Sequence, residues 1–225
     1  MPDSPMKKIL PFILVGLLAS AARAETPLNA DQQLIKAATN GDITAVKDLL
    51  AHGAKVQARD EHGWTALMAA THANQVEAAR MLIAAGSDVN AKDLRQDSPY
   101  LYAGAEGRLE ILRLTLAAGA DLKSTNRFGG TALIPAAEKG HVENVRELLR
   151  TKIDVNHVNR LGWTALMETA MKKGRGPVHT EITQLLLAAG ANPNIPDHEG
   201  VTPLAHAEQA GNKEIATLLR AAGGR

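Results

Sequence analysis

The chain has 225 residues, with 25 Lys and Arg against 24 Asp and Glu, a formal net charge of +1 and no cysteine. This near-neutral balance, without basic runs that interleave with aromatic residues, argues against nucleic-acid binding, and the lack of cysteine excludes disulfides and thiol chemistry. Aromatic residues make up 3% of the chain and hydrophobic residues 45%, so a core must be built mainly from Ala, Leu, Val and Ile.

The first 24 residues have the three parts of a secretory signal peptide. Lys7 and Lys8 form a short positive region, residues 9–18 are almost wholly apolar, and the small residues Ala22 and Ala24 suit a signal peptidase. The apolar stretch is shorter than the roughly 20 residues that a membrane-spanning helix needs. The sequence therefore predicts cleavage after Ala24, export to the periplasm or beyond, and no membrane insertion afterwards. An uncleaved membrane anchor is the alternative.

One short phrase recurs after this segment, and its spacing predicts the fold. The hydroxyl residues that open it lie 33, 33, 33 and 38 positions apart, and they are Thr65, Ser98, Thr131, Thr164 and Thr202. A fixed period of this length is typical of a solenoid, in which similar units stack and share one continuous core. Residues 25–225 are therefore predicted to form a single all-α repeat solenoid.

The unit from Gly63 to Gly86 shows how one repeat should fold. Thr65 is a good helix N-cap, because its hydroxyl can accept a hydrogen bond from an N–H group of the first turn. A short helix should follow and end at Asn74, and residues 76–84 have the apolar side of a second helix. Gly86 stands where the chain must turn through the left-handed region before it enters a polar finger.

The same register fits the rest of the chain and divides it into about six units. Glycine occupies the end of the second helix in five of them, at Gly53, Gly86, Gly119, Gly190 and Gly223. Asn90, Asn156 and Asn194 open the fingers, where an amide can bond the local backbone. The units span residues 28–62, 63–95, 96–128, 129–161, 162–199 and 200–225. The terminal units should be polar caps, because one of their sides has no neighbour; Glu208 and Arg220 indicate this in the last unit.

These phased openings and glycines resemble the ankyrin-repeat family, and in particular its exported bacterial members, over residues 28–225. The resemblance implies paired antiparallel helices, with β-hairpin fingers near a right angle to them. It also implies a concave recognition surface, formed by the fingers and the first helices, that binds another protein and performs no chemistry.

Units three and four depart from this pattern at three positions. Lys152 stands where the other units have glycine, which costs about 1–2 kcal/mol if the residue is left-handed. Pro135 lies inside the first helix of its unit, at the first position whose N–H group should be bonded. Thr115 replaces a core leucine. We therefore expect weaker protection from hydrogen exchange in units three and four than in unit two.

The fingers carry the candidate partner-binding residues. Arginine occurs there beside large apolar side chains, a composition found at the centres of protein interfaces. The candidates are Arg59, Leu94, Arg95, Arg127, Phe128, Arg160, Leu161 and His198, together with Trp64 and Trp163 at the inner base of two fingers. The alternative is a set of solvated tips with incidental apolar residues. The two tryptophans are equally open to a packing role, in which each indole lies across its own finger.

The sequence offers no pattern for catalysis or for a bound cofactor. It contains no nucleophile elbow, phosphate-binding loop or dinucleotide-binding turn. Its eight histidines lack metal-site spacing and a cysteine partner, and His141 and His179 share a place before the second helix that suits a structural role. Catalytic, cofactor and metal residues are therefore predicted to be absent.

Five extra residues fall within Lys172–Pro177, between the two helices of unit five. Insertions in solenoids map to loops, and some of these are functional. The cations Lys172, Lys173 and Arg175 could dock an acidic patch. We interpret the segment instead as a tolerated, mobile surface loop.

Together these features predict a non-catalytic protein-interaction module of the bacterial envelope. The chain should act as a monomeric scaffold or stabiliser that holds a partner protein of the envelope on its concave face. A pre-ordered surface loses little entropy on docking, so aromatic and arginine side chains can supply the affinity. The alternative is an inhibitor or immunity protein that blocks a toxin or hydrolase. An enzyme is a third hypothesis, for which the sequence has no catalytic motif.

Overall fold

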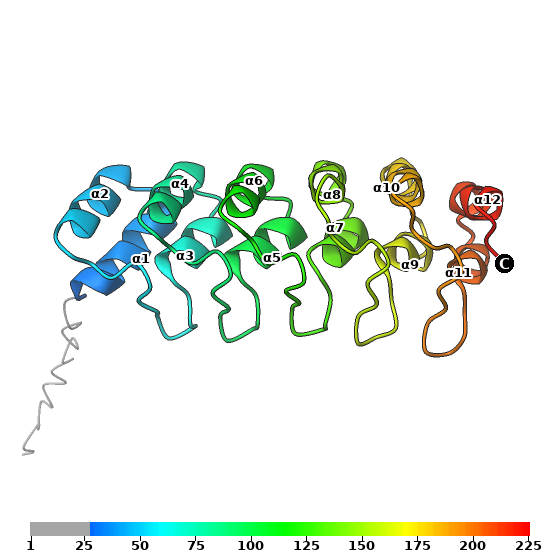
Figure 1. Cartoon of the computed structure of the whole chain (residues 1–225), viewed down its shortest axis with the longest axis horizontal. Coiled ribbons are helices and arrows are strands. Elements are labelled where there is room, and N and C mark those ends of the chain that lie inside the picture. The colour runs from blue at the N-terminus through cyan, green and yellow to red at the C-terminus, as the bar shows by residue number, and fades with distance from the viewer. Residues whose placement is uncertain (1–27) are drawn as a thin grey trace, which may run out of the picture.

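The computed structural model describes residues 28–225, so the proposed signal peptide of residues 1–24 lies outside the described part. The described chain forms a row of helix pairs connected by long loops (Figure 1). The helices are α1 (Ala30–Asn40), α2 (Ile43–Ala51), α3 (Ala66–His72), α4 (Val76–Ala84), α5 (Pro99–Ala105), α6 (Leu109–Ala117), α7 (Leu133–Lys139), α8 (Val142–Leu149), α9 (Ala165–Ala170), α10 (Pro177–Ala188), α11 (Pro203–Ala210) and α12 (Lys213–Ala221). The predicted all-α solenoid of about six units is confirmed.

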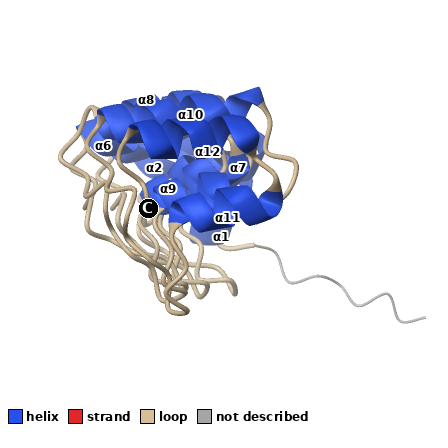
Figure 2. Ribbon diagram, turned by 90° about the vertical axis from the view of Figure 1, so that its right-hand side faces the viewer, coloured by secondary structure: helices blue, strands red, loops and turns tan. Residues whose placement is uncertain are grey.

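The helix pairs stack into two layers that share one core. The first helices form one layer and the second helices the other, and the long loops project from one side of both (Figure 2). The buried apolar cluster extends from Leu34 in α1 to Leu219 in α12. Ala70 and Ala137 are fully buried, and such small side chains let neighbouring helices approach closely. The core is thus built mainly from Ala, Leu, Val and Ile, as the composition indicates.

Side-chain hydroxyls begin most of the first helices, as predicted. Thr65 Oγ1 accepts a hydrogen bond from the Met68 N–H group at 3.2 Å. The equivalent acceptors in three other units are Ser98, Thr164 and Thr202, at distances of 3.2, 3.1 and 3.3 Å. Each cap satisfies one N–H group that the helix itself leaves unbonded.

The fingers are tight loops, and the described residues contain no β-strand, so the predicted hairpins form without strand pairing. One backbone hydrogen bond closes each finger, such as that from Asp93 N–H to the Asp97 carbonyl at 2.9 Å. Side-chain oxygens supply further bonds: Asp93 Oδ1 accepts from the N–H groups of Arg95 and Asp97 at 2.8 and 3.0 Å. The same arrangement recurs at Asp60, Asn126, Asn159 and Asp197. Local turn bonds, rather than a sheet, therefore shape the fingers.

The asparagines that open the fingers join neighbouring units, so the prediction of a local role for their amides was wrong. Asn90 Oδ1 accepts from Asp121 N–H at 2.8 Å, and the Asn90 amide donates to the Gly119 carbonyl at 3.2 Å. Asn156 and Asn194 form the corresponding pairs of bonds with the units that follow them. Stacking places the turn that follows the second helix of the next unit within hydrogen-bonding distance of each asparagine side chain. The amide therefore bonds to the next unit instead of to the backbone of its own finger.

Unit four ends its second helix differently, and the strain considered for Lys152 is absent. Lys152 is not among the residues with positive φ. α8 has 8 residues, where α4 and α6 have 9. The Thr151 hydroxyl donates to the Leu148 carbonyl at 2.6 Å and accepts from Ile153 N–H at 3.2 Å. A side-chain cap therefore replaces the glycine turn.

Pro135 alters the start of α7 in the same unit. α7 begins two residues after Thr131, whereas α3 begins directly after Thr65. The Thr131 hydroxyl is buried without a hydrogen-bond partner, so the cap found in other units is missing here. Thr115, the third predicted departure, is fully buried and donates to the Leu112 carbonyl at 2.8 Å. Unit four is irregular near Pro135 and Lys152, whereas the helices of unit three have the same lengths as those of unit two. The exchange behaviour of both units stays a prediction.

Polar side chains cover both ends of the solenoid. In the last unit Arg220 pairs with Glu208. In the first unit Asn29 caps α1, and Asp31 accepts from the Lys55 N–H group at 2.7 Å. None of the helices within residues 28–225 combines the length and the apolarity needed to cross a membrane.

Candidate protein-binding groove

A cavity between the fingers and the first helices forms a groove over units three to five. The cavity has a volume of about 420 Å³. Finger residues form one wall, and α5, α7 and α9 form the other. The side chains that line the helical wall include Tyr102, Ile134, Pro135, Glu138 and Glu168. The first helices of three successive units therefore contribute to one recess.

Half of the predicted partner-binding residues line this cavity. They are Arg95, Arg127, Phe128, Leu161 and Trp163. The other five lie outside the cavity lining, and they are Arg59, Trp64, Leu94, Arg160 and His198. The fold thus brings five of the predicted residues together in a recess, and the other five lie along the row of fingers.

Phe128 and Leu161 form an exposed apolar rim on the cavity. They come from neighbouring fingers, and 46% and 43% of their surfaces remain exposed. The Arg127 guanidinium lies 4.6 Å from the centre of the Phe128 ring and 3.8 Å from the Asp97 carboxylate. Contacts of this kind hold a cation over an aromatic face. The rim therefore offers pre-ordered apolar surface, which supplies affinity at protein interfaces.

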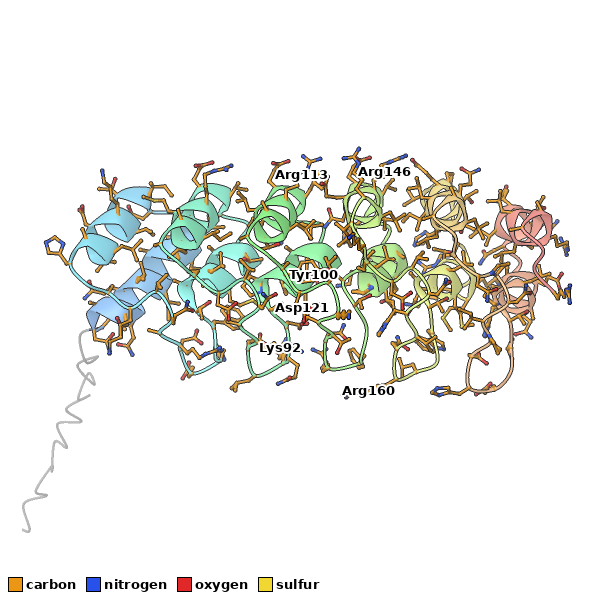
Figure 3. The ribbon with its side chains drawn as sticks, viewed as in Figure 1. Lys92, Tyr100, Arg113, Asp121, Arg146 and Arg160 are labelled. Carbon is orange, nitrogen blue, oxygen red and sulfur yellow. The ribbon has the colours of Figure 1, made fainter. Side chains whose placement is uncertain are left out.

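Arg59 and Arg160 hold neighbouring fingers together. Arg59 Nη1 donates to the Lys92 carbonyl at 2.6 Å and to the Gly63 carbonyl at 2.7 Å. Arg160, which lies at a fingertip in Figure 3, donates through Nη1 to the Arg127 carbonyl at 3.1 Å. Part of their hydrogen-bonding capacity is therefore used within the chain, so both residues have a structural role, and their role in binding a partner stays a prediction.

Leu94 and His198 extend the candidate surface beyond the cavity in opposite directions. Leu94 is 74% exposed on the finger that precedes α5. His198 is exposed on the finger that precedes α11, where its ring and backbone lie against Gly162 of the neighbouring finger. Both residues are accessible, but neither contributes to the recess.

Trp64 has a packing role, although it crosses to the next finger rather than its own. Its indole N–H donates to Asp93 Oδ2 at 3.1 Å. His72 lies between Trp64 and Tyr102 in a stack, with ring centres 4.3 and 4.1 Å away, and its Nδ1 atom is 3.1 Å from the Tyr102 hydroxyl. Burial lowers the pKa of His72 below its ordinary value. The sequence did not reveal this stack, because its members lie in different units.

Trp163 occupies the same place in unit five but lines the cavity instead. The residue that matches the partner of Trp64 is Asp197, whose Oδ2 atom is bonded to His206 Nε2 at 2.7 Å. That bond lowers the pKa of Asp197 below its ordinary value. Trp163 therefore differs from Trp64 in two observed respects: the matching carboxylate is bonded to His206, and the indole lines the recess.

Glu168 is a buried carboxyl group in the lining of the cavity. It is 3% exposed, and its Oε2 atom has no hydrogen-bond partner. Burial raises the pKa of Glu168 to about 7, and the carboxylate of Glu138 adds to the shift. Glu168 was not among the residues predicted from the sequence to bind a partner. The available signal was an acidic side chain inside α9, at the place where α3 has Ala69.

The inserted loop of unit five is tied back onto the groove. Arg175 Nη1 donates to the Glu138 carbonyl at 2.9 Å, and Arg175 Nη2 donates to the Glu168 carbonyl at 2.8 Å. Lys172 pairs with the Glu138 carboxylate. Two of the three loop cations therefore make contacts within the chain, instead of projecting freely toward an acidic patch.

The chemistry of this groove suits recognition. Its described surface combines apolar contact, a cation–π pair and a carboxyl group that lacks a partner. His141 lies directly before α8, but His179 lies in the first turn of α10, so the predicted place before the second helix was wrong for His179. Burial lowers the pKa of each, and His179 Nε2 is 3.0 Å from the Glu138 carbonyl. Within residues 28–225, no group of three or more His, Cys, Asp or Glu side chains could hold a metal ion.

Comparisons with known proteins agree with this architecture. A family model described as ankyrin repeats in three copies matches residues 9–93, 100–197 and 152–224. The crystal structure of an ankyrin repeat domain from Acinetobacter baumannii AYE is similar, with 59% identity, a TM-score of 0.82, and coverage of 85% of this chain and 98% of that one. A crystal structure of another ankyrin repeat protein is 40% identical, with a TM-score of 0.82 and coverage of 86% of this chain and 98% of that one. No curated protein matches the chain.

Proposed function

The chain belongs to the ankyrin-repeat family, and from this premise we propose that it binds a partner protein of the bacterial envelope in the groove between its fingers and first helices. Ankyrin repeats are generally protein–protein interaction modules and are typically non-catalytic. In this proposal the chain acts as a monomeric scaffold or stabiliser, and the partner keeps its own activity while bound.

The recess over units three to five is the observation that carries the proposal. Phe128 and Leu161 are large apolar side chains that remain exposed at its rim, beside the ordered Arg127. Interfaces concentrate their affinity in such central clusters of apolar, aromatic and arginine side chains. The stacked helices hold the rim in place before the partner arrives, so docking orders few groups.

Capture of the partner tests this function. A variant with Arg127, Phe128, Arg160 and Leu161 all changed to Ala should lose capture of the envelope partner while its helicity is unchanged. The matched control changes Arg113 and Arg146, which lie on the second helices, away from the fingers (Figure 3). Unchanged capture by the fourfold variant would remove the site assignment. A captured enzyme that is inactive in the complex would favour the inhibitor alternative over the scaffold.

The envelope setting rests on the sequence of residues 1–24, and it has a separate test. If the signal peptide is removed after Ala24, the protein recovered from the periplasmic fraction should begin at Glu25. N-terminal sequencing of the fractionated protein measures this directly. Recovery of the chain in the membrane fraction with residues 1–24 intact would contradict cleavage and support an uncleaved anchor.

A further inference from the structure

Most charged side chains in the cavity lining are paired; the two without a salt bridge among the described residues are the cation Arg95 and one carboxyl group. The carboxylate of Asp97 lies 3.8 Å from Arg127, and the lining carboxylates of Glu106 and Glu138 pair with Lys139 and Lys172. The remaining carboxyl group in the lining is that of Glu168. It has no salt bridge among the described residues, and one of its oxygens is buried without a hydrogen bond.

The nearby cations Lys172 and Arg175 lower the pKa of Glu168 through their charge, but neither forms a salt bridge with its carboxyl group. Lys172 pairs with Glu138, and the Arg175 guanidinium donates to the main-chain carbonyls of Glu138 and Glu168 rather than to the Glu168 side chain. Arg95 is at the end of unit two, on the finger that precedes α5, whereas α9 belongs to unit five. A buried carboxylate without a donor is costly. A donor that is supplied from outside the chain would therefore be bound favourably.

The walls around this carboxyl group suit a flat cation. Trp163, Phe128, Ile134 and Pro135 line the same cavity. Its volume of about 420 Å³ falls within the range of roughly 300–1,000 Å³ that is typical of small-molecule sites. A guanidinium stacks on aromatic faces and donates two parallel hydrogen bonds to a carboxylate. The ammonium of lysine can do neither, because it is a compact point charge.

We propose that this cavity receives an arginine side chain of the partner protein, whose guanidinium pairs with the Glu168 carboxylate beside Trp163. The inference rests on the proposed function of the groove and specifies the chemistry of the segment that docks there. Charge complementarity supports it, because the occupant supplies the cation that Glu168 lacks. The rim residues Phe128 and Leu161 then contact the partner on either side of the inserted arginine.

A pair of small probes tests the pocket without knowledge of the partner. Acetyl-arginine-amide should shift the NMR signals of the Trp163 indole and the Glu168 amide, whereas acetyl-citrulline-amide, which is nearly the same shape without the charge, should bind at least ten-fold more weakly. The variant Glu168→Gln should lose at least ten-fold in affinity for the arginine probe. The matched control Glu199→Gln, on an exposed finger, should not. Equal binding of the two probes, or an unaffected Glu168→Gln variant, would overturn the proposal.

A second measurement keeps the test informative if the substitution disturbs folding. Carbon-detected NMR of the unmodified chain reports the ionisation of the Glu168 carboxyl group directly. It should titrate near pH 7 in the free protein, as its burial indicates, and at clearly lower pH when the arginine probe is saturating. Titration in the ordinary acidic range for the free protein would mean that Glu168 already has a partner within the chain, and the proposal would fail.

Capture of the partner separates this inference from the proposed function. Glu168→Gln should weaken capture at least ten-fold, as should the fourfold alanine variant of the fingers. If Glu168→Gln captures as well as the unmodified chain does while the fourfold variant does not, the arginine pocket is overturned and the groove function stands. If both variants capture normally, the groove function itself is wrong.

Discussion

Units two and three (residues 63–128) and units four and five (residues 129–199) show two ways of building the same stack. In the first region Thr65 caps its helix through a hydroxyl, and Asn90 ties its finger to the next unit. In the second region the hydroxyl of Thr131 has no partner, glycine is missing from the end of α8, and an insertion separates α9 from α10. The helices nevertheless keep their register in the row (Figure 1).

Buried polar contacts take over where the repeated ones are lost. Lys123 stands at the finger position of the tying asparagine and makes no equivalent hydrogen bond within the described residues. Instead Asn144, which is 2% exposed in α8, donates from Nδ2 to the carbonyls of Ala103 and Gly104 at 2.9 and 3.2 Å. The matching residue of unit three is the buried Ile111. The comparison shows that the repeated residues fix the arrangement of the helices, whereas different hydrogen bonds can link one unit to the next.

The largest expected effect concerns Glu168, a polar group of the second region that is buried without compensation. Its folded-state pKa of about 7 lies above the ordinary 4.5. The protonated group therefore contributes stability that is complete below about pH 4.5 and is lost as the pH rises through 7. At about 1.4 kcal/mol per pKa unit, the unmodified chain should lose about 3 kcal/mol relative to Glu168→Gln between pH 4.5 and pH 8.

Urea unfolding at a series of pH values measures this difference. Glu61→Gln is the control from the first region, because the Glu61 side chain is 88% exposed, and it should leave the pH profile unchanged. The free energies of unfolding of the unmodified chain and of Glu168→Gln should diverge as the pH rises. Parallel profiles across this range would show that Glu168 is not a buried, uncompensated carboxyl group.

The next largest effect is expected at Asn144, whose hydrogen bonds link units three and four where the finger asparagine is missing. Asn144→Ala removes two buried hydrogen bonds and leaves the Gly104 carbonyl without this donor, while the Ala103 carbonyl keeps the Arg108 N–H group at 2.9 Å. The free energy of unfolding should fall by about 2 kcal/mol. Asn90→Ala removes a more accessible tie in the first region and should cost about 1 kcal/mol. Chemical denaturation of both variants makes the comparison. A smaller loss for Asn144→Ala than for Asn90→Ala would break the argument that the buried bonds compensate.

The cap of α8 predicts a smaller loss. Thr151→Ala removes the hydroxyl that bonds both the Leu148 carbonyl and the Ile153 N–H group, and it should destabilise the chain by about 1 kcal/mol, as the loss of other helix caps does. Thr151→Ser keeps the hydroxyl and should retain most of the stability. Thermal and urea unfolding check both variants. Equal stability of the alanine and serine variants would show that the Thr151 hydroxyl does not stabilise the end of α8.

The parts of this fold that repeat could be predicted from the sequence, and the parts that are used once could not. Thr65 and Gly86 recur at fixed spacing, so their roles follow from the period and from local backbone chemistry. Asn144 and Glu168 lie at positions where the other units have apolar or different side chains, so no pattern marks them. Their surroundings come from neighbouring units, which a linear sequence does not place beside them.

The candidate site shows the same division. Phe128 and Leu161 were recognisable because apolar residues at successive fingertips are unusual on a solvated surface. The different environments of Trp64 and Trp163 could not be recognised, because they involve an aspartate of the next finger. That aspartate accepts from Trp64 in one unit and is bonded to His206 in the other. Contacts between units therefore decide which of two equivalent residues packs and which one faces the groove.

The last expected difference is in local opening, and it tests the two regions without any substitution. Amide hydrogens of α7 and α8 should exchange through openings that cost about 1 kcal/mol less than those of α3 and α4, because Thr131 lacks its cap bond and Pro135 cannot donate within its helix. Native-state hydrogen exchange followed by NMR resolves this for each residue. Ala69 and Ala136 are a useful pair, since their N–H groups bond the carbonyls of Thr65 and Ala132 at 3.0 and 3.3 Å. Equal protection in the two regions would mean that the bonds of Asn144 and Thr151 restore local stability completely, and the second region would then be irregular in structure alone.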